Sequence, residues 1–242
     1  MASRKTIIAF DLYGTLLSTE SIAGELAKLF GDDVSKPLAA LWRRYQLEYT
    51  WRINSMGVYR TFSEVTRGAL HHAAGDLGLT VSDADAEGLM QAYNALHVFP
   101  EIPAALKLVE QTAGADAVIF SNGTPDMVSA SVATSPDLKT YEGLFRGLIT
   151  VDGLGVFKPD RRTYDHLARE AAKLGAAGDV WVVSANPFDA VGAEAAGLRA
   201  AWIDRAAKGW VDRLGDVIGG VRPTIVVDGV DKAVEEILRR SV

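Results

Sequence analysis

The sequence predicts an α/β protein whose parallel β-sheet is covered by helices on both faces and interrupted by an inserted helical subdomain. Two observations indicate the sheet: short apolar, β-rich runs recur along the 242 residues, and Ala- and Leu-rich stretches separate most of them. A third observation indicates the insertion. About eighty residues after the first run show helical periodicity without a convincing strand.

The predicted strands and helices alternate over most of the chain. We expect strands at residues 6–10, 117–120, 180–183, 200–203 and 224–227, and helices at residues 102–112, 161–174 and 189–196. In a parallel sheet of this kind, reactive groups gather at the C-terminal ends of the strands. Asp11, Ser121 and Ser184 each directly follow one of the apolar runs. The sequence therefore predicts that these three polar residues share one site.

Residues 18–98 are predicted to form a cap over the active end of the sheet. Helical periodicity is present at residues 22–30, 37–53, 62–74 and 84–96. The segment 98–103 contains two prolines, which fix the backbone where the chain returns to the core. We therefore expect a catalytic core of residues 1–17 and 99–242 and a helical cap of residues 18–98, since closing lids commonly exclude water from a site.

Composition and charge narrow the classes of function. The 25 Lys and Arg residues and the 31 Asp and Glu residues give a net charge of −6 without a block of like charge, which argues against nucleic acid or an anionic membrane as a partner. The chain has no cysteine, so disulfides, thiolate metal sites and cysteine nucleophiles are excluded. Because we find neither a signal peptide nor a run of roughly 20 apolar residues, we expect a soluble cytoplasmic protein.

Asp11 allows two interpretations. It follows the apolar run 7–10, and a carboxylate at that place could simply cap the strand-to-helix turn. Alternatively, Gly14 suits a tight turn and the Thr15 hydroxyl orients the carboxylate, which then acts as a nucleophile through an ester intermediate. Asp11 taken alone leaves both interpretations open.

Four motifs in order resemble the haloacid dehalogenase superfamily. They are Asp11-Leu12-Tyr13-Gly14-Thr15, Ser121-Asn122-Gly123, Lys158-Pro159 and Ser184-Ala185-Asn186-Pro187-Phe188-Asp189. Each motif is weak alone, but together they span nearly the whole predicted core. The resemblance implies that Asp11 is a nucleophile, that the sheet is Rossmann-like and that the helical insertion is a cap.

Tyr13 distinguishes this chain from the phosphatases of that superfamily. Those enzymes carry a second aspartate two residues after the nucleophile and bind Mg²⁺ with an acidic pair in the fourth motif. This chain has Tyr13 at that place, and Asp189 is the one acidic residue of its fourth motif. Mg²⁺ requires hard oxygen ligands, and two carboxylates are too few for a good site. A magnesium-dependent phosphatase is therefore the less favoured alternative, together with a non-catalytic binding protein on the same scaffold.

The same residues resemble the L-2-haloacid dehalogenase branch. That branch is characterised by Asp-x-Tyr-Gly-Thr and Ser-x-Asn-x-x-Asp, and the cap segment LWRRYQLEYTW at residues 41–51 is a second match. The resemblance implies that Arg43 receives the departing halide, whereas we expect Arg44 on a solvated helix face. It also implies hydrolysis of short (S)-2-haloacids to (R)-2-hydroxyacids and halide, with no metal or other cofactor.

The resemblance assigns the remaining roles by position. Catalytic roles fall to Asp11, Thr15, Arg43, Lys158, Tyr164, Ser184, Asn186 and Asp189. Substrate-binding roles fall to Leu12, Tyr13, Arg43, Leu47, Phe62, Ser121, Asn122 and Phe188. For Leu47 and Phe62, an equal alternative to substrate binding is that they simply form part of the apolar core of the cap. The expected partners are a small 2-haloalkanoate and its halide ion, and by analogy a second copy of the chain in a homodimer.

Overall fold

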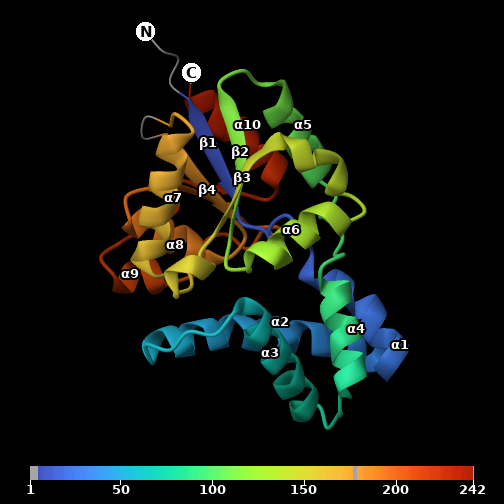
Figure 1. The fold of residues 1–242 in the computed structure, drawn as a ribbon. Coiled ribbons are helices and arrows are strands. Elements are labelled where there is room, and N and C mark those ends of the chain that lie inside the picture. The colour runs from blue at the N-terminus through green and yellow to red at the C-terminus, as the bar shows by residue number, and fades with distance from the viewer. Residues whose placement is uncertain (1–4, 177–178, 242) are drawn as a thin grey trace.

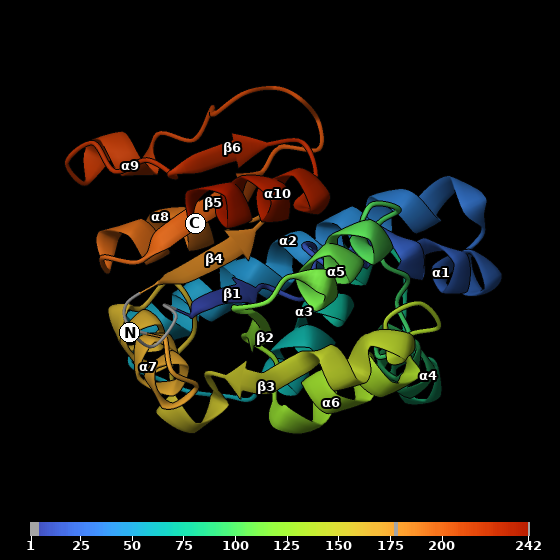
Figure 2. The same cartoon turned by 90° about the horizontal axis from the view of Figure 1, so that it is seen from above.

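The computed structural model describes residues 5–176 and 179–241, and the residues outside these ranges belong to the predicted core segments. A six-stranded parallel sheet in the order β3-β2-β1-β4-β5-β6 forms its centre (Figure 2). The strands are β1 (Thr6–Phe10), β2 (Ala115–Ser121), β3 (Phe145–Thr150), β4 (Val180–Ser184), β5 (Arg199–Ile203) and β6 (Ile225–Val227). This architecture confirms the predicted α/β fold with a Rossmann-like sheet.

β3 is the strand that the sequence did not predict. Its segment Phe-Arg-Gly-Leu-Ile-Thr contains an arginine and a glycine and lacks a continuous apolar run. β3 lies at the edge of the sheet, and most of its side chains are partly or fully exposed. An edge strand of this kind needs less apolar surface than a central one, so it leaves a weaker signal in the sequence.

Helices cover both faces of the sheet. Figure 1 places α5 (Ile102–Gln111) and α10 (Val230–Arg240) on one side, where they pack against each other. The helices α7 (Arg161–Lys173) and α8 (Pro187–Ala195) pack together on the other side. The shorter connections contain α6 (Pro125–Thr134), η2 (Lys139–Leu144), η3 (Asp152–Leu154) and α9 (Leu214–Val217).

The chain between β1 and α5 forms a separate helical layer, as predicted for an inserted cap. It consists of η1 (Thr19–Ile22), α1 (Ala23–Phe30), α2 (Asp32–Ser55), α3 (Phe62–Asp76) and α4 (Asp83–Tyr93). Figure 1 shows this layer beyond the C-terminal ends of the strands. Two of its helices begin at side-chain caps: Thr61 and Glu64 form a capping box on α3, and the Ser82 hydroxyl accepts from the N–H of Asp85 on α4.

The first residue of α2 differs from the prediction. The helical periodicity of the sequence begins at Pro37. In the structure α2 begins at Asp32, and Pro37 lies in its second turn. The carboxylates of Asp32 and Asp33 stand in the first turn, where they complement the helix dipole.

The two segments that join the insertion to the sheet lie side by side. Leu17 and Val98 form an antiparallel bridge, and the N–H of Ser18 donates to the carbonyl of His97 at 2.8 Å. The N–H of Phe99 donates to the carbonyl of Leu16 at 3.2 Å. These bonds hold the outgoing and returning chains together directly beside the turn that carries Asp11.

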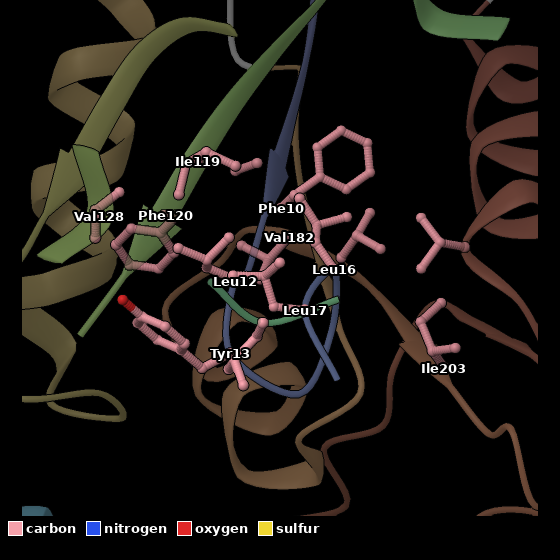
Figure 3. Close-up of a cluster of buried hydrophobic side chains, with 14 of the residues drawn as sticks. Phe10, Leu12, Tyr13, Leu16, Leu17, Ile119, Phe120, Val128, Val182 and Ile203 are labelled. Carbon is pink, nitrogen blue, oxygen red and sulfur yellow. The ribbon is translucent and has the colours of Figure 1, made fainter. Parts of the chain in front are cut away.

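A continuous apolar core lies beneath that turn. Figure 3 shows buried side chains of β1 and the following turn packed against β2, α6, β4 and β5; they include Phe10, Leu12, Tyr13, Leu16, Leu17, Ile119, Phe120, Val128, Val182 and Ile203. Burial of one such side chain stabilises the folded state by roughly 1.5–3 kcal/mol, so this core holds the turn firmly in place. Within the described ranges, no helix is both long and apolar enough to cross a bilayer.

Candidate active site

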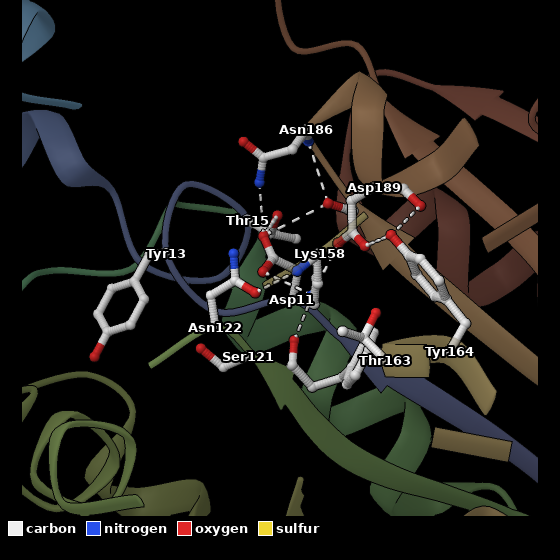
Figure 4. A network of polar contacts seen from close by, with 12 residues as sticks. Asp11, Tyr13, Thr15, Ser121, Asn122, Lys158, Thr163, Tyr164, Asn186 and Asp189 are labelled. Atoms are coloured by element: carbon white, nitrogen blue, oxygen red, sulfur yellow. Dashed lines mark hydrogen bonds and ion pairs between the residues drawn. The ribbon is translucent and has the colours of Figure 1, made fainter. Parts of the chain in front are cut away.

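The C-terminal ends of three neighbouring strands bring the predicted polar residues together. β2 and β4 flank β1, so Ser121 and Ser184 end the strands on either side of Asp11. The N–H of Asp11 donates to the carbonyl of Val183 at 3.0 Å, which continues the pairing of β1 with β4. Figure 4 shows the resulting network of polar contacts.

Four side chains donate to the Asp11 carboxylate. Its Oδ2 accepts from the Thr15 hydroxyl at 2.7 Å, from Asn186 Nδ2 at 2.8 Å and from the Ser184 hydroxyl at 3.5 Å. Its Oδ1 accepts from Lys158 Nζ at 3.2 Å. Asp11 is 7% exposed, and such charge-assisted bonds at a buried place restrict the rotation of the carboxylate.

Lys158 lies between two carboxylates. Its ammonium donates to Asp11, to Asp189 Oδ2 at 2.9 Å and to the carbonyl of Phe120 at 2.7 Å. An ammonium has three protons, and each of the three has an acceptor here. Lys158 is only 1% exposed, so these contacts replace the water that the charge loses on burial.

Asp189 is fully buried and bonded from two sides. Tyr164 donates from its hydroxyl to Asp189 Oδ1 at 2.8 Å, and Lys158 donates to the other carboxylate oxygen. Burial raises the pKa of Asp189, and the Asp11 charge acts in the same direction, while Lys158 opposes both. Burial and the Asp189 charge also raise the pKa of Tyr164 well above its ordinary value, so its phenol stays neutral.

Arg43 reaches the Asp11 turn from the inserted layer. It lies on α2, and its Nη2 donates to the carbonyl of Tyr13 at 2.6 Å and to Asn186 Oδ1 at 3.5 Å. Gly14 has φ +89° and lies under the guanidinium; a Cβ added there would stand 3.4 Å from Arg43 Nη2. A glycine at position 14 therefore allows both the left-handed backbone and the close approach of the arginine.

Gln46 also belongs to this site, although no role was predicted for it from the sequence. Its side chain is fully buried, and its Oε1 accepts from Arg43 Nη1 at 2.6 Å and from the Tyr93 hydroxyl at 3.1 Å. Its Nε2 donates to the Thr66 hydroxyl at 2.7 Å. The position of Gln46 three residues after Arg43 on a predicted helix is the signal that could have indicated this pairing.

Tyr13 forms part of an apolar wall. Its ring packs against Phe62 at a centroid distance of 5.9 Å and against Tyr93 at 5.5 Å, and its hydroxyl bonds with the Ser131 hydroxyl at 3.0 Å. Burial raises the pKa of Tyr13, so the phenol is neutral. A Cβ at Gly123 would stand 3.1 Å from the Tyr13 ring, which explains the glycine in the second motif.

The residues of the second motif support the turn and the lysine. The Ser121 hydroxyl accepts from the N–H of Gly123 at 3.0 Å, and Asn122 Oδ1 accepts from the N–H of Lys158 at 2.9 Å. The carbonyl of Leu12 closes the turn after β1 by accepting from the N–H groups of Leu16 and Leu17. Three of the predicted binding residues, Leu12, Ser121 and Asn122, are buried here.

Two predicted residues lie further from the Asp11 network. The Phe188 ring packs edge-on against Trp51 at 5.1 Å and lines a cleft of about 510 Å³ with Pro159 and Leu214. Leu47 lies one turn beyond Arg43 on α2 and is half-buried. Phe62, in contrast, is 1% exposed and packs within the core as well as on Tyr13.

Within residues 5–176 and 179–241, no group of three or more His, Asp and Glu side chains is arranged to hold a metal ion. The two carboxylates that converge on the site share Lys158 as their common partner.

A parallel sheet with a lysine-paired aspartate at its C-terminal edge, facing an arginine from an inserted helical layer, defines a class of α/β hydrolases. The sequence family model of the haloacid dehalogenase-like hydrolases matches residues 5–197 of this chain. The chain therefore belongs to this family. The family predicted from the four motifs is thereby confirmed.

Individual relatives narrow the comparison to one branch. An (S)-2-haloacid dehalogenase from Pseudomonas sp. (strain YL) is 37% identical over 201 residues, 82% of this chain and 82% of that protein. Haloacetate dehalogenase H-2 from Moraxella sp. (strain B) is 35% identical over 198 residues, 82% of this chain and 85% of that protein. The L-2-haloacid dehalogenase of Xanthobacter autotrophicus, solved with chloropropionic acid covalently bound, matches with a TM-score of 0.82 at 30% identity, covering 97% of this chain and 98% of that one.

Proposed function

We propose that this chain hydrolyses short (S)-2-haloacids to (R)-2-hydroxyacids and halide through an ester on Asp11, without a metal ion. The observation that carries the proposal is the Asp11 carboxylate, buried and bonded to Lys158, Thr15 and Asn186. The similarity of the chain to (S)-2-haloacid dehalogenases over four fifths of its length supports the same reaction.

In the first step, a carboxylate oxygen of Asp11 attacks C2 of the substrate from the face opposite the halogen. The new C–O bond forms as the carbon–halogen bond breaks, the halide leaves with the bonding electrons, and C2 is inverted. Lys158, paired with Asp11, offsets the repulsion between the Asp11 carboxylate and the substrate carboxylate. Arg43 and Asn122 stabilise the halide where its charge develops, with Phe188 as an apolar edge.

In the second step, water attacks the carbonyl carbon of the Asp11 ester. Asp189 takes the proton, and its raised pKa makes it a stronger base than an ordinary carboxylate. Ser184 and Asn186 hold the water, and Tyr164 fixes the Asp189 carboxylate through its 2.8 Å bond. The bond between the carbonyl carbon and the original Asp11 oxygen then breaks, and that oxygen takes the proton back from Asp189 and leaves as the product hydroxyl. The water oxygen stays in the regenerated Asp11 carboxylate, and the second water proton passes to solvent.

Substrate recognition uses charge at one end and apolar surface at the other. Ser121 holds the substrate carboxylate together with the N–H groups near Leu12 and Tyr13, and the Tyr13 ring, Leu47 and Phe62 cover the apolar side. This assignment is supported by the contact of Tyr13 with Phe62 and by the half-buried place of Leu47 near Arg43. On this proposal, residues 18–98 act as the cap and residues 1–17 and 99–242 as the core.

A decisive experiment follows halide release from (S)-2-chloropropionate in the presence of EDTA, with p-nitrophenyl phosphate and Mg²⁺ assayed in parallel. We expect halide release that EDTA does not reduce, and its loss in Asp11→Asn. A single turnover in H₂¹⁸O should place ¹⁸O in Asp11 and leave the product unlabelled. Turnover of the phosphate ester alone would instead identify a phosphatase, and inactivity in both assays a non-catalytic protein.

The proposed homodimer and cytoplasmic location are expectations from the resemblance and from the sequence. Sedimentation equilibrium of the purified protein and fractionation of the source cells would test them, and a monomer or a membrane-bound pool would refute them.

A further inference from the structure

The last turn of α2 is bonded to the backbone directly before the site lysine. Asn54 Nδ2 donates to the carbonyl of Phe157 at 2.7 Å, and the N–H of Phe157 donates to Asn54 Oδ1 at 3.0 Å. The two residues are 103 positions apart in the chain. A primary amide has both a donor and an acceptor, so one Asn54 side chain satisfies both backbone groups of one buried residue.

A second asparagine holds the next residue. Asn122 Oδ1 accepts from the N–H of Lys158 at 2.9 Å, so the backbone of residues 157 and 158 is bonded from opposite sides of the site. One bond comes from the end of β2 and the others come from the inserted layer. The Lys158 side chain then extends from this doubly held backbone to Asp11 and Asp189.

Aromatic packing surrounds the same point. The Phe157 ring lies 5.3 Å from the Tyr59 ring and 6.0 Å from the Phe62 ring, measured between centroids. Tyr59 and Phe62 both come from the inserted layer, and the Tyr59 hydroxyl also donates to Asp152. Phe157 is therefore a principal point of contact between the insertion and the loop that carries Lys158.

We propose that Asn54 is a positioning residue for the dehalogenation reaction: it fixes the backbone at Phe157 and thereby places Lys158 Nζ between Asp11 and Asp189. The inference rests on the proposed function for its kinetic test. It makes the geometry of the lysine depend on the seating of α2. Arg43 lies on the same continuous helix, about 16 Å before Asn54 at 1.5 Å per residue, so one rigid element brings the arginine and the lysine into place together.

The test compares Asn54→Ala with Tyr59→Phe. The first variant removes both bonds to Phe157, whereas the second removes another bond between the insertion and the core, to Asp152, and keeps the Tyr59 ring on Phe157. The pH profiles of kcat and kcat/KM for (S)-2-chloropropionate are measured for both variants. The deuterium exchange of the peptide containing Phe157 and Lys158 is measured as well, with thermal unfolding as the stability readout.

We expect kcat/KM of Asn54→Ala to fall about tenfold or more, because two bonds that place the lysine are lost. The acid limb of its kcat profile should move to higher pH, since Lys158 opposes the burial that raises the pKa of Asp189, the base of the hydrolysis step, and opposes it less when it retracts. Exchange at Phe157 should accelerate in Asn54→Ala and not in Tyr59→Phe, whose acid limb should match the unchanged protein.

Equal pH profiles and equal exchange in Asn54→Ala and the unchanged protein would overturn the proposal, and so would an equal shift in Tyr59→Phe. If Asn54→Ala does not fold, Asn54→Ser takes its place, because a hydroxyl on one carbon is too short to span both backbone groups. The exchange measurement separates this inference from the proposed function. A protein without dehalogenase activity would refute the proposed reaction, while the exchange at Phe157 would still report whether Asn54 holds that backbone.

Discussion

Replacement of Gln46 by leucine tests whether the orientation of Arg43 matters for halide departure. The change nearly conserves side-chain volume in a fully buried place and removes the amide that accepts from Arg43 Nη1 at 2.6 Å. The same amide accepts from Tyr93 at 3.1 Å and donates to Thr66 at 2.7 Å. Arg43 would keep its bond to the carbonyl of Tyr13 but lose the contact that fixes the other end of its guanidinium fork.

The expected magnitude follows from these contacts. A hydrogen bond to a charged group contributes about 1.5–3 kcal/mol, and if that stabilisation is lost in the transition state, the rate falls roughly 10- to 150-fold. The free energy of unfolding should also fall by about 1–3 kcal/mol, because the buried Tyr93 hydroxyl loses its acceptor. The rate of chloride release should fall more than the rate of bromide release, since chloride is the poorer leaving group and depends more on stabilisation of the developing charge.

The assay is halide release from (S)-2-chloropropionate and (S)-2-bromopropionate, quantified by ion chromatography. Thr66→Val is the matched control, because it removes a neighbouring bond to Gln46 and leaves the Arg43 contact in place. We expect this control to lose stability and keep most of its activity. A Gln46→Leu protein that releases chloride within twofold of the unchanged rate would refute the argument.

Two further predictions concern the Asp189 side of the site. Gly192→Ala brings a Cβ into collision with the Tyr164 hydroxyl and to 2.8 Å from Pro159, so Tyr164 is pushed away from Asp189. Ester hydrolysis should slow, and intact-mass spectrometry should detect enzyme esterified on Asp11; Gly88→Ala, at an open position, should accumulate none. Tyr164 stays protonated in the folded state above the pH at which it ionises when unfolded, so stability should fall as the pH rises above about 10. Thermal unfolding at pH 9 and 11 checks this, and an equally steep loss in Tyr164→Phe would contradict it.

The sequence predicted those parts of the fold that depend on local patterns. β1, β2, β4 and β5 lie in the middle of the sheet, and each contains a continuous apolar run whose burial explains its clear signal. β3 escaped prediction because an edge strand can alternate with polar residues and glycine. The start of α2 escaped it because the helical periodicity of the sequence begins only at Pro37, in the second turn of the helix.

For the site, the sequence indicated residues whose chemistry is visible in a short motif. Asp11, Thr15, Lys158 and Asp189 lie in one bonded network at the C-terminal edge of the sheet. The contacts of Ser131 and Asn54 could not be read in the same way, because each depends on how the inserted layer or α6 packs against the core. Such contacts join residues far apart in the chain, and a hydrophobic pattern fixes which face of a helix is buried but not which polar atom it meets.

The proposed reaction moves one negative charge across the site, and the structure has a cation at both ends of that path. Before attack the charge lies on Asp11, bonded to Lys158; after ester formation it lies on the halide beside Arg43. Asn186 contacts both ends: its Nδ2 donates to Asp11 Oδ2 and its Oδ1 accepts from Arg43. Two fixed cations stabilise such a transfer without reorganisation, since neither has to move as the charge does. Phosphoryl transfer instead concentrates charge on the phosphate oxygens, and Tyr13 offers them a neutral aromatic ring where a second carboxylate would help to hold a divalent ion.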